Sequence, residues 1–426
     1  MTKETSDGYL DLAGLASRIY GIIEEQKGSF QLKSTVPYLQ LTARYFERAV
    51  QAKEEGKYVV GHTVLMPPEI FYAMDIVPLS AEHCATCIKL FSDTQELLSM
   101  AADHGMPPEI CSVHRITDSL VRSGAFPRVD SYVYSNQVCD NTHKGGEMMA
   151  AHHGTPAYFV DRPYTVTSAA SMSYFKEELR GLISFLEVQT GRKMDYDRLQ
   201  EVVRLSYQGA QLCQQINELR KVVPSPMPAE GAFYPCGVYW SQAGSPEAVS
   251  CLEQLRDELK ERVAKGIGAV PKERFRILYP FVYPYWDMEL LALMEKRYAA
   301  VATPDVMQRW GGEWLIDPSD PIGNLARKST VQSAVYQLHG PAQPWVEDAV
   351  QMGREFRADG AIFVAHIGCR QGCAAIRPVK EELQSRLGIP TVIINGDLFD
   401  NTFVSRNEVM DKLDGFFEMI EDRDRQ

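Results

Sequence analysis

The sequence has few basic residues for its length and no long apolar run. Its 426 residues include 44 lysines and arginines against 56 acidic residues, which gives a net charge of −12. An acidic surface of this kind argues against nucleic acid as the main partner. No apolar run reaches the length of a membrane span, and the polar residues 1–10 do not form a signal peptide. We therefore expect a cytoplasmic protein that uses neither a membrane nor a nucleic acid.

Common nucleotide-binding and hydrolase motifs are absent as well. The sequence has no G-x-x-x-x-G-K-[ST] phosphate loop and no G-x-G-x-x-G turn after a strand. It also has no G-x-S-x-G elbow of the kind that positions a nucleophilic serine. The chain is therefore not expected to hydrolyse ATP itself or to hold a nicotinamide in the usual way.

Short apolar segments of strand length alternate with helical patterns through most of the chain. This alternation predicts parallel α/β architecture. The length of 426 residues indicates two or three domains. The strands are expected at residues 58–62, 76–79, 132–134, 157–160, 276–279, 299–301, 361–367 and 391–394.

Helical spacing and breaker residues indicate where these domains begin and end. Residues 9–54 have helical periodicity, and residues 171–221 form a long helical pattern that is broken at Thr190-Gly191. The polar, proline-rich stretch 223–235 is the best candidate for a domain boundary. We therefore predict an N-terminal helical segment at 1–55, a first α/β domain at 56–222 and a second at 223–426.

Six of the nine cysteines stand in loop-like positions of this pattern. In a reducing compartment, cysteines are more often free thiols or metal ligands than disulfides. Open parallel sheets bind ligands beyond the carboxyl ends of their strands, and most of the six follow a predicted strand. Cys111 instead stands at a predicted helix start, where backbone N–H groups favour a thiolate. The six are Cys84 and Cys87 after strand 76–79, Cys111, Cys139 after strand 132–134, and Cys369 and Cys373 after strand 361–367.

Two kinds of metal centre fit these cysteines. Six thiols are the number that two three-thiolate iron-sulfur cubanes require, whereas structural zinc usually takes four ligands in two close pairs. The two close pairs would suit zinc but would leave Cys111 and Cys139 without a role. The spacing alone does not decide between the two. The remaining cysteines are interpreted as small buried hydrophobes: Cys213, Cys236 and Cys251.

Three polar residues near these cysteines are candidate proton donors. His143 and Lys144 follow Cys139 closely, although they equally suit the start of a helix. His366 ends an apolar strand three residues before Cys369, where a buried core histidine is the default and a proton donor is the sharper hypothesis. The aromatic residues 279–286 indicate either a substrate pocket or packing at a strand end.

Several short motifs, taken in order, resemble the family of 2-hydroxyacyl-CoA dehydratase and benzoyl-CoA reductase subunits. The resemblance runs from about residue 40 to the end of the chain, which is the scale of whole domains. The motifs are the segment Pro68–Pro78, Cys111-Ser112 with Arg115, Cys139-Asp140-Asn141, the segment Leu186–Gly191, Gly368-Cys369-Arg370-Gln371, and the segment Asn395–Asp400 followed by Arg406.

The resemblance implies a fold, a cofactor and a partner. It implies two Rossmann-like, doubly wound α/β domains with a metal cluster between them. The cluster would be a [4Fe-4S] cubane on Cys111, Cys139 and Cys369, with one iron left open. A separate homodimeric iron-sulfur ATPase would deliver low-potential electrons, and the chain itself would be a homodimer. The missing phosphate loop agrees with this division of labour.

The sequence departs from the usual dehydratase pattern in three additional thiols. Cys84, Cys87 and Cys373 stand beside the three family positions, a pattern similar to that of double-cubane cluster proteins. By that resemblance the chain would hold two cubanes, bridged by a sulfide as an [8Fe-9S] cluster, and would reduce a small unsaturated substrate. The alternatives are a single-cubane dehydratase or aryl-CoA reductase subunit, an electron-storage protein, and a zinc-stabilised binding module.

Overall fold

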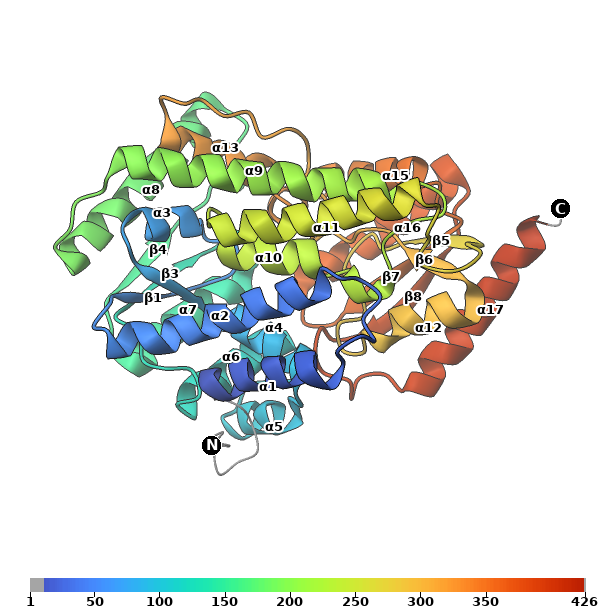
Figure 1. Ribbon diagram of the computed structural model, residues 1–426, viewed down its shortest axis with the longest axis horizontal. Coiled ribbons are helices and arrows are strands. Elements are labelled where there is room, and N and C mark those ends of the chain that lie inside the picture. The colour runs from blue at the N-terminus through green and yellow to red at the C-terminus, as the bar shows by residue number, and fades with distance from the viewer. Residues whose placement is uncertain (1–10, 425–426) are drawn as a thin grey trace.

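The computed structural model describes residues 11–424, and two four-stranded sheets organise the chain (Figure 1). The first sheet has the strand order β2-β1-β3-β4 and the second has the order β6-β5-β7-β8, with parallel pairing throughout. The predicted α/β class with two parallel sheets is confirmed. The strands are β1 Val59–His62, β2 Val77–Ser80, β3 Ser131–Ser135, β4 Ala157–Val160, β5 Phe275–Leu278, β6 Ala300–Ala302, β7 Gly360–His366 and β8 Thr391–Gly396.

Helices connect the strands and surround the sheets (Figure 1). No helix within residues 11–424 combines the length and the apolar character needed to span a membrane. The helices are α1 Leu12–Glu25, α2 Thr35–Glu54, α3 Pro68–Ala73, α4 Ala81–Phe91, α5 Gln95–Asp103, α6 Ser112–Arg122, α7 Asp140–His153, α8 Ala169–Thr190, α9 Tyr196–Arg220, α10 Tyr234–Gln242, α11 Pro246–Ala264, α12 Glu289–Tyr298, α13 Pro321–Val331, α14 Val335–Leu338, α15 Gln343–Glu355, α16 Arg370–Leu387 and α17 Arg406–Asp424, with a 3-10 turn at Ala229–Gly231.

The two sheets are wound in the same way. In each sheet the second strand lies on one side of the first strand and the third strand lies on the other. Ligands of such sheets bind at the carboxyl ends of the strands that flank this reversal. The reversal lies between β1 and β3 in one sheet and between β5 and β7 in the other, so a functional site is expected at these strand ends.

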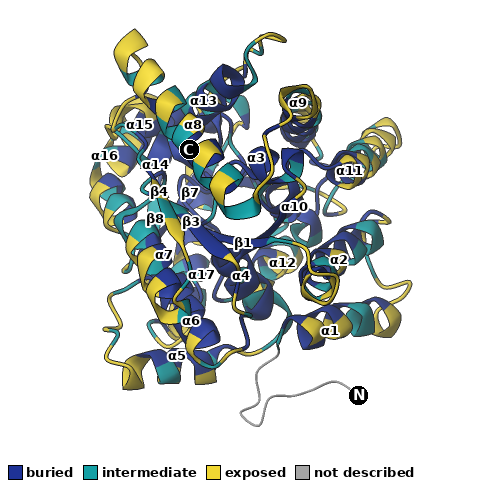
Figure 2. Cartoon of the chain, turned by 90° about the vertical axis from the view of Figure 1, so that its left-hand side faces the viewer, coloured by how far each residue is buried: buried dark blue, intermediate teal, exposed yellow. Residues whose placement is uncertain are grey.

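The central strands are buried because they are apolar on both faces. All residues of β7 are buried, from Gly360 to His366, and β1 is buried along its whole length. A parallel sheet that is covered on both faces needs such continuous apolar runs. Figure 2 shows this buried centre in dark blue, while the yellow exposed surface lies mostly on the outer faces of helices.

The N-terminal helices α1 and α2 confirm the predicted helical start of the chain. The Asp11 side chain caps α1 by accepting a hydrogen bond from the N–H of Gly14 at 2.8 Å. The sequence predicts helical structure over residues 9–54 with a second helix around residues 45–50, and the break between the two helices lies at residues 26–34. The first two residues of the predicted segment lie outside the described part of the chain. Helix α2 packs against β2, α10 and α11, which fixes this helical pair to the first sheet and to the helices that follow it.

The long helices α8 and α9 are separated where the sequence predicts a break. Gly191 ends α8 with a left-handed backbone at φ 69°, which glycine adopts without steric cost. Helix α9 then runs along the upper edge of the molecule in Figure 1, from the first sheet to the second. At its end Arg220 donates hydrogen bonds to Gln308 Oε1 at 2.9 Å and to the Tyr283 hydroxyl at 3.0 Å. Helix α9 thus links the two sheets.

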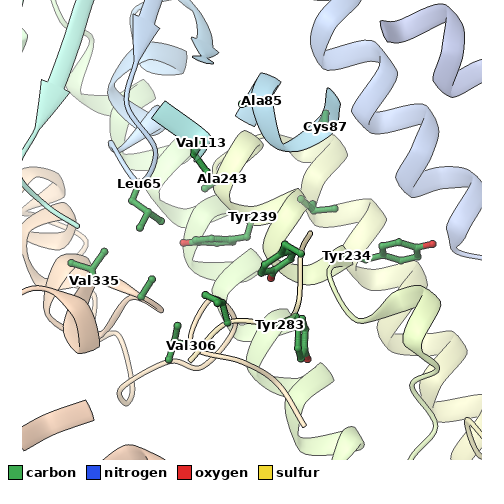
Figure 3. Close-up of a cluster of buried hydrophobic side chains, with 14 of the residues drawn as sticks. Leu65, Ala85, Cys87, Val113, Tyr234, Tyr239, Ala243, Tyr283, Val306 and Val335 are labelled. Atoms are coloured by element: carbon green, nitrogen blue, oxygen red, sulfur yellow. The ribbon is translucent and has the colours of Figure 1, made fainter. Parts of the chain in front are cut away.

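One hydrophobic core is continuous through both sheets. Figure 3 shows part of it, where Leu65 and Val113 of the first half face Tyr239 of α10. Val306 and Val335 of the second half lie on the other side of the same cluster. Because apolar side chains of both halves share this core, the strand ends of the two sheets are held in a fixed relation.

The structure corrects the predicted surroundings of Cys84 and Cys87. Both residues were expected in a loop after a strand, but they lie inside helix α4, which begins directly after β2. The hydroxyl of Ser80 caps this helix by accepting a hydrogen bond from the N–H of His83 at 3.3 Å. The Ser80 cap and the buried, apolar inner face stabilise α4 as a helix. The sequence had indicated only a short pair of cysteines in this segment.

Candidate metal centre

Three of the predicted cysteine ligands occupy the same structural position on three different helices. Cys111 is the N-cap of α6, Cys139 is the N-cap of α7, and Cys369 is the N-cap of α16. All three line one cavity with a volume of about 450 Å³. The structure therefore brings together Cys111, Cys139 and Cys369, which lie far apart in the sequence.

The topology explains why two of these cysteines meet. Cys139 follows β3 and Cys369 follows β7, and each of these is the third strand of its sheet. Both thiols therefore stand at the reversal point of strand order, beyond the carboxyl end of a strand, where ligands of such sheets bind. Cys111 reaches the same cavity from the loop that precedes α6.

Backbone N–H groups approach all three sulfur atoms. The N–H of Gly372 donates to Cys369 Sγ at 3.3 Å. Backbone N–H groups of Asn141 and Thr142 partly offset the rise that burial causes in the pKa of Cys139, and that of Val113 does the same for Cys111. The first N–H groups of a helix lack partners within the helix and carry a positive partial charge, so they stabilise thiolates or an anionic cluster.

Glycine at position 368 allows the two halves of the site to touch. A Cβ atom at Gly368 would lie 2.5 Å from both the N and the Cα atoms of Cys111. A Cβ at Gly372 would in turn lie 2.4 Å from the ring of Phe281. These glycines permit a backbone approach that any larger residue would prevent, as a compact cluster site requires.

A buried carboxylate and a histidine stand behind the thiol of Cys111. The Nε2 atom of His366 lies 3.2 Å from Cys111 Sγ, and its Nδ1 atom faces Asp397 Oδ2 at 3.5 Å. Asp397 accepts hydrogen bonds from the N–H groups of Ser112 and Phe399 at 3.3 and 3.1 Å. Burial lowers the pKa of His366 to about 4, so the imidazole is neutral at physiological pH.

A second arrangement of the same kind stands behind Cys139. The Nε2 atom of His114 lies 3.8 Å from Cys139 Sγ, and its Nδ1 atom lies 3.8 Å from Glu82 Oε1. Burial lowers the pKa of His114 and raises the pKa of Glu82 to about 7. Two of the three thiols thus have a buried histidine beside them, with a buried carboxyl group on the far side of the ring.

The thiols themselves are protonated as long as nothing binds them. Burial raises the pKa of Cys111 and Cys139 and raises the pKa of Cys369 to about 12. A coordinating metal removes the thiol proton outright. Three thiols, their N–H donors and the glycine contacts therefore fit a metal cluster better than a free thiolate nucleophile.

The other three predicted ligands do not line this cavity. Cys84 and Cys87 are fully buried in α4, and Cys87 Sγ lies 3.6 Å from His83 Nε2. Cys373 is exposed in the first turn of α16, where its thiol donates to the carbonyl of His366 at 3.3 Å. Among the described residues, no group of three or more Cys, His, Asp or Glu side chains is arranged to hold a single metal ion.

The candidate proton donors separate in the same way. His366 lines the cavity and contacts Cys111, whereas His143 and Lys144 lie in the first turns of α7 and do not line it. The ring of His143 packs 5.8 Å from that of Phe159, and Lys144 is exposed. His143 and Lys144 thus lie at the start of a helix, outside the lining of the cavity.

Sequence reasoning missed several residues of the cavity wall. Glu82 and His114 were not singled out, although His114 follows Cys111 by three residues and so lies on the same helical turn. Cys236 was interpreted as a small hydrophobe, and it is a buried residue of the wall. Phe233 and Trp240 also line the cavity, at helical spacing from Cys236, which is the signal that points to them.

The fold and the site define a class of protein: an α/β protein with two parallel sheets and a cavity, lined by cysteines, at the carboxyl ends of their strands. Residues 63–420 match the family described as 2-hydroxyglutaryl-CoA dehydratase, D-component. The chain belongs to this family of 2-hydroxyacyl-CoA dehydratase and benzoyl-CoA reductase subunits, as its motifs suggested.

Curated relatives match along nearly their whole length. The chain is 23% identical to the (R)-phenyllactyl-CoA dehydratase alpha subunit of Clostridium sporogenes, over 93% of this chain and 97% of that protein. It is 23% identical to a benzoyl-CoA reductase subunit of Thauera aromatica, over 92% of this chain and 95% of that protein. It is also 23% identical to the (R)-2-hydroxyisocaproyl-CoA dehydratase alpha subunit of Clostridioides difficile, over 90% and 95%.

Proposed function

We propose that this chain is the cluster-bearing subunit of an acyl-CoA dehydratase or reductase. One [4Fe-4S] cluster would be held by Cys111, Cys139 and Cys369 and would supply single electrons at low potential. The observation that carries the proposal is the convergence of three N-capping cysteines on one cavity. Its relatives support the substrate class, because by their names they act on coenzyme A thioesters.

The electrons would come from a separate homodimeric iron-sulfur ATPase. This part of the proposal is supported by the absence of a phosphate loop from the sequence, since low-potential electron delivery needs an energy source outside this chain. The exposed rim of the cavity, which carries Arg370 paired with Asp140 at 2.6 Å, is the side from which such a partner would approach.

The residues of this chain would hold the cluster, tune it and shield it. The thiolates would bind iron, and N–H groups at the three helix starts would stabilise the negative charge. His366 Nε2 would donate a hydrogen bond to the Cys111 sulfur, and His114 Nε2 would do so for Cys139. The apolar wall of the cavity would keep water away from the reacting group.

A second candidate is the double-cubane reductase of small unsaturated molecules. The observation that favours it is the position of Cys373 one helical turn after Cys369, at the rim of the same site. The second cubane would use Cys84, Cys87 and Cys373. It would require helix α4 to turn two thiols out of the core, because Cys84 and Cys87 are fully buried beside the N-terminal helices.

The deciding experiment is an anaerobic purification followed by iron and acid-labile sulfide analysis per chain. About four irons would support the single cluster, and about eight would support the double cubane. Zinc without sulfide would overturn both. Elution volume on a calibrated sizing column would test the proposed homodimer in the same preparation.

Serine variants make the assignment specific. Each of the three single serine variants, at Cys111, Cys139 or Cys369, should lose the iron and the EPR signal of the reduced protein. Cys84→Ser and Cys373→Ser are matched controls, which should keep about four irons if only one cluster is present. Loss of about half the iron in these controls would instead support two cubanes.

A further inference from the structure

The cavity that holds the three thiols also has a wall of apolar and aromatic side chains. Helix α10 contributes Cys236 and Trp240, and its N-cap residue Phe233 lies one turn before Cys236. The segment that follows β5 contributes Phe281 and Tyr285 to the same wall. Side chains of further segments complete it: Val64, Val138, Val282, Met307, Leu338 and Phe399.

The polar atoms of this wall are turned away from the cavity toward other partners. The hydroxyl of Tyr285 donates a hydrogen bond to Asp305 Oδ2 at 2.9 Å. The indole Nε1 of Trp240 donates to Ser333 Oγ at 3.3 Å. With these groups already paired, the wall offers a bound molecule apolar and aromatic surface rather than hydrogen-bond donors.

Positive charge is scarce around the cavity. Arg370 is the one permanent cation among its described lining residues, and its side chain is 78% exposed and paired with Asp140 at 2.6 Å. Glu82 and Glu109 also line the cavity. His83 adds no charge at neutral pH, because burial lowers its pKa to about 4. A bound carboxylate would therefore find acidic groups nearby and no buried cation.

We infer that the cavity selects coenzyme A thioesters whose acyl group is apolar and uncharged, an inference that rests on the proposed function. A carboxylate at the far end of the acyl chain would lose its hydration without gaining a buried cation, which is strongly unfavourable. A small aliphatic chain or an aromatic ring would instead bury its surface against the side chains of α10 and the segment after β5. The cluster would occupy part of the cavity volume of about 450 Å³, so the space left for the acyl group admits only a small one.

The inference is tested with a matched pair of thioesters. Pentanoyl-CoA and glutaryl-CoA have acyl chains of equal carbon number and differ in a terminal carboxylate. Each is titrated by calorimetry into anaerobically purified, cluster-loaded protein, with free coenzyme A as the baseline. Pentanoyl-CoA should bind more tightly than glutaryl-CoA, by on the order of 100-fold.

A charge placed in the wall should change this preference. Met307 is half-buried and lines the cavity, so Met307→Arg would present a cation to the acyl group. The variant should bind glutaryl-CoA more tightly and pentanoyl-CoA more weakly than the unmodified protein. Met307→Leu is the control for substitution without charge, since it keeps volume and apolar character and should keep the preference for pentanoyl-CoA.

The possible results separate the inference from the function on which it rests. Equal affinities for the two thioesters, or tighter binding of glutaryl-CoA to the unmodified protein, would overturn the inference and leave the function standing. If cluster-loaded protein bound neither thioester more tightly than free coenzyme A, the proposed acyl-CoA function itself would be overturned.

Discussion

The contact between Gly368 and Cys111 leads to the sharpest structural prediction. Substitution of alanine would place a methyl carbon 2.5 Å from the N and Cα atoms of Cys111 and 3.0 Å from His366 Cε1. Carbon atoms in contact are normally about 3.5 to 4.0 Å apart, so the backbones must separate by about 1 Å. The two closest atoms belong to backbone, and no rotation of a side chain can relieve the contact.

The expected consequence is loss of the cluster together with a moderate loss of stability. Overpacking of this kind typically costs about 1 to 3 kcal/mol. The movement that relieves it displaces the N-cap of α6, which carries the Cys111 ligand. Iron per chain, measured in anaerobically purified Gly368→Ala protein, should therefore fall well below the unmodified value, and the urea midpoint should fall with it.

A second glycine serves as the control for this substitution. Gly415 lies in α17 on the surface, and a Cβ added there would meet no atom within 4 Å. Gly415→Ala should keep the full iron content and should stabilise the protein slightly, by about 0.5 to 1 kcal/mol, because alanine favours a helix. Gly368→Ala protein with full iron content and an unchanged midpoint would show that the backbone contact is not needed for the site.

Three further predictions concern buried charges and the cluster. Glu69 and Lys328 form a buried ion pair at 2.6 Å, so Glu69→Gln or Lys328→Met alone should destabilise the protein by about 3 to 5 kcal/mol in urea melts, and the double variant by less than their sum. Burial raises the pKa of Glu295 from 4.5 to about 8, so the free energy of unfolding should decline as the pH rises between these values. Glu295→Gln should remove this decline, which urea melts of both proteins at pH 5 and pH 8 would measure. If the free energy of unfolding of the variant differed from that of the unmodified protein by the same amount at both pH values, the prediction would be contradicted. His366→Phe should lower the cluster reduction potential in an EPR titration, because the hydrogen bond to Cys111 is lost; an unchanged potential would mean that His366 only packs there.

The sequence was sufficient to predict the sheets because their strands carry a strong local signal. The apolar run at 361–367, for example, became β7 within one residue at each end. Helix α4 was missed because the short segment around Cys84 and Cys87 looked like a cysteine motif, while its helix start depends on a cap from Ser80. Local patterns could not reveal which cysteines meet, since that depends on how the two sheets pack.

The groups that stand behind the cysteines were beyond sequence reasoning for the same reason. His366 was a candidate, but its partner Asp397 lies on a loop after the next strand, and only the fold places it behind the ring. The contact of Gly368 with Cys111 joins residues more than two hundred positions apart. Short motifs indicated the cysteine ligands, whereas the groups that orient them come from tertiary packing.

The repeated winding of the two sheets accounts for two of the three cysteines that stand at helix N-caps around the cavity. Cys139 and Cys369 occupy equivalent places, each at the start of the helix after the third strand of its sheet. The helix before that strand is α6 in the first half, where Cys111 is the N-cap, and α15 in the second half, where the N-cap is Ala342. The repeat therefore supplies one matched pair of thiols and a single unmatched third. A cubane on three thiolates would leave one iron without a protein sulfur. The apolar and aromatic side chains of α10 line the same cavity. The N-cap position that holds Cys111 in the first half is occupied by Ala342 in the second, so the second half offers no matching thiol.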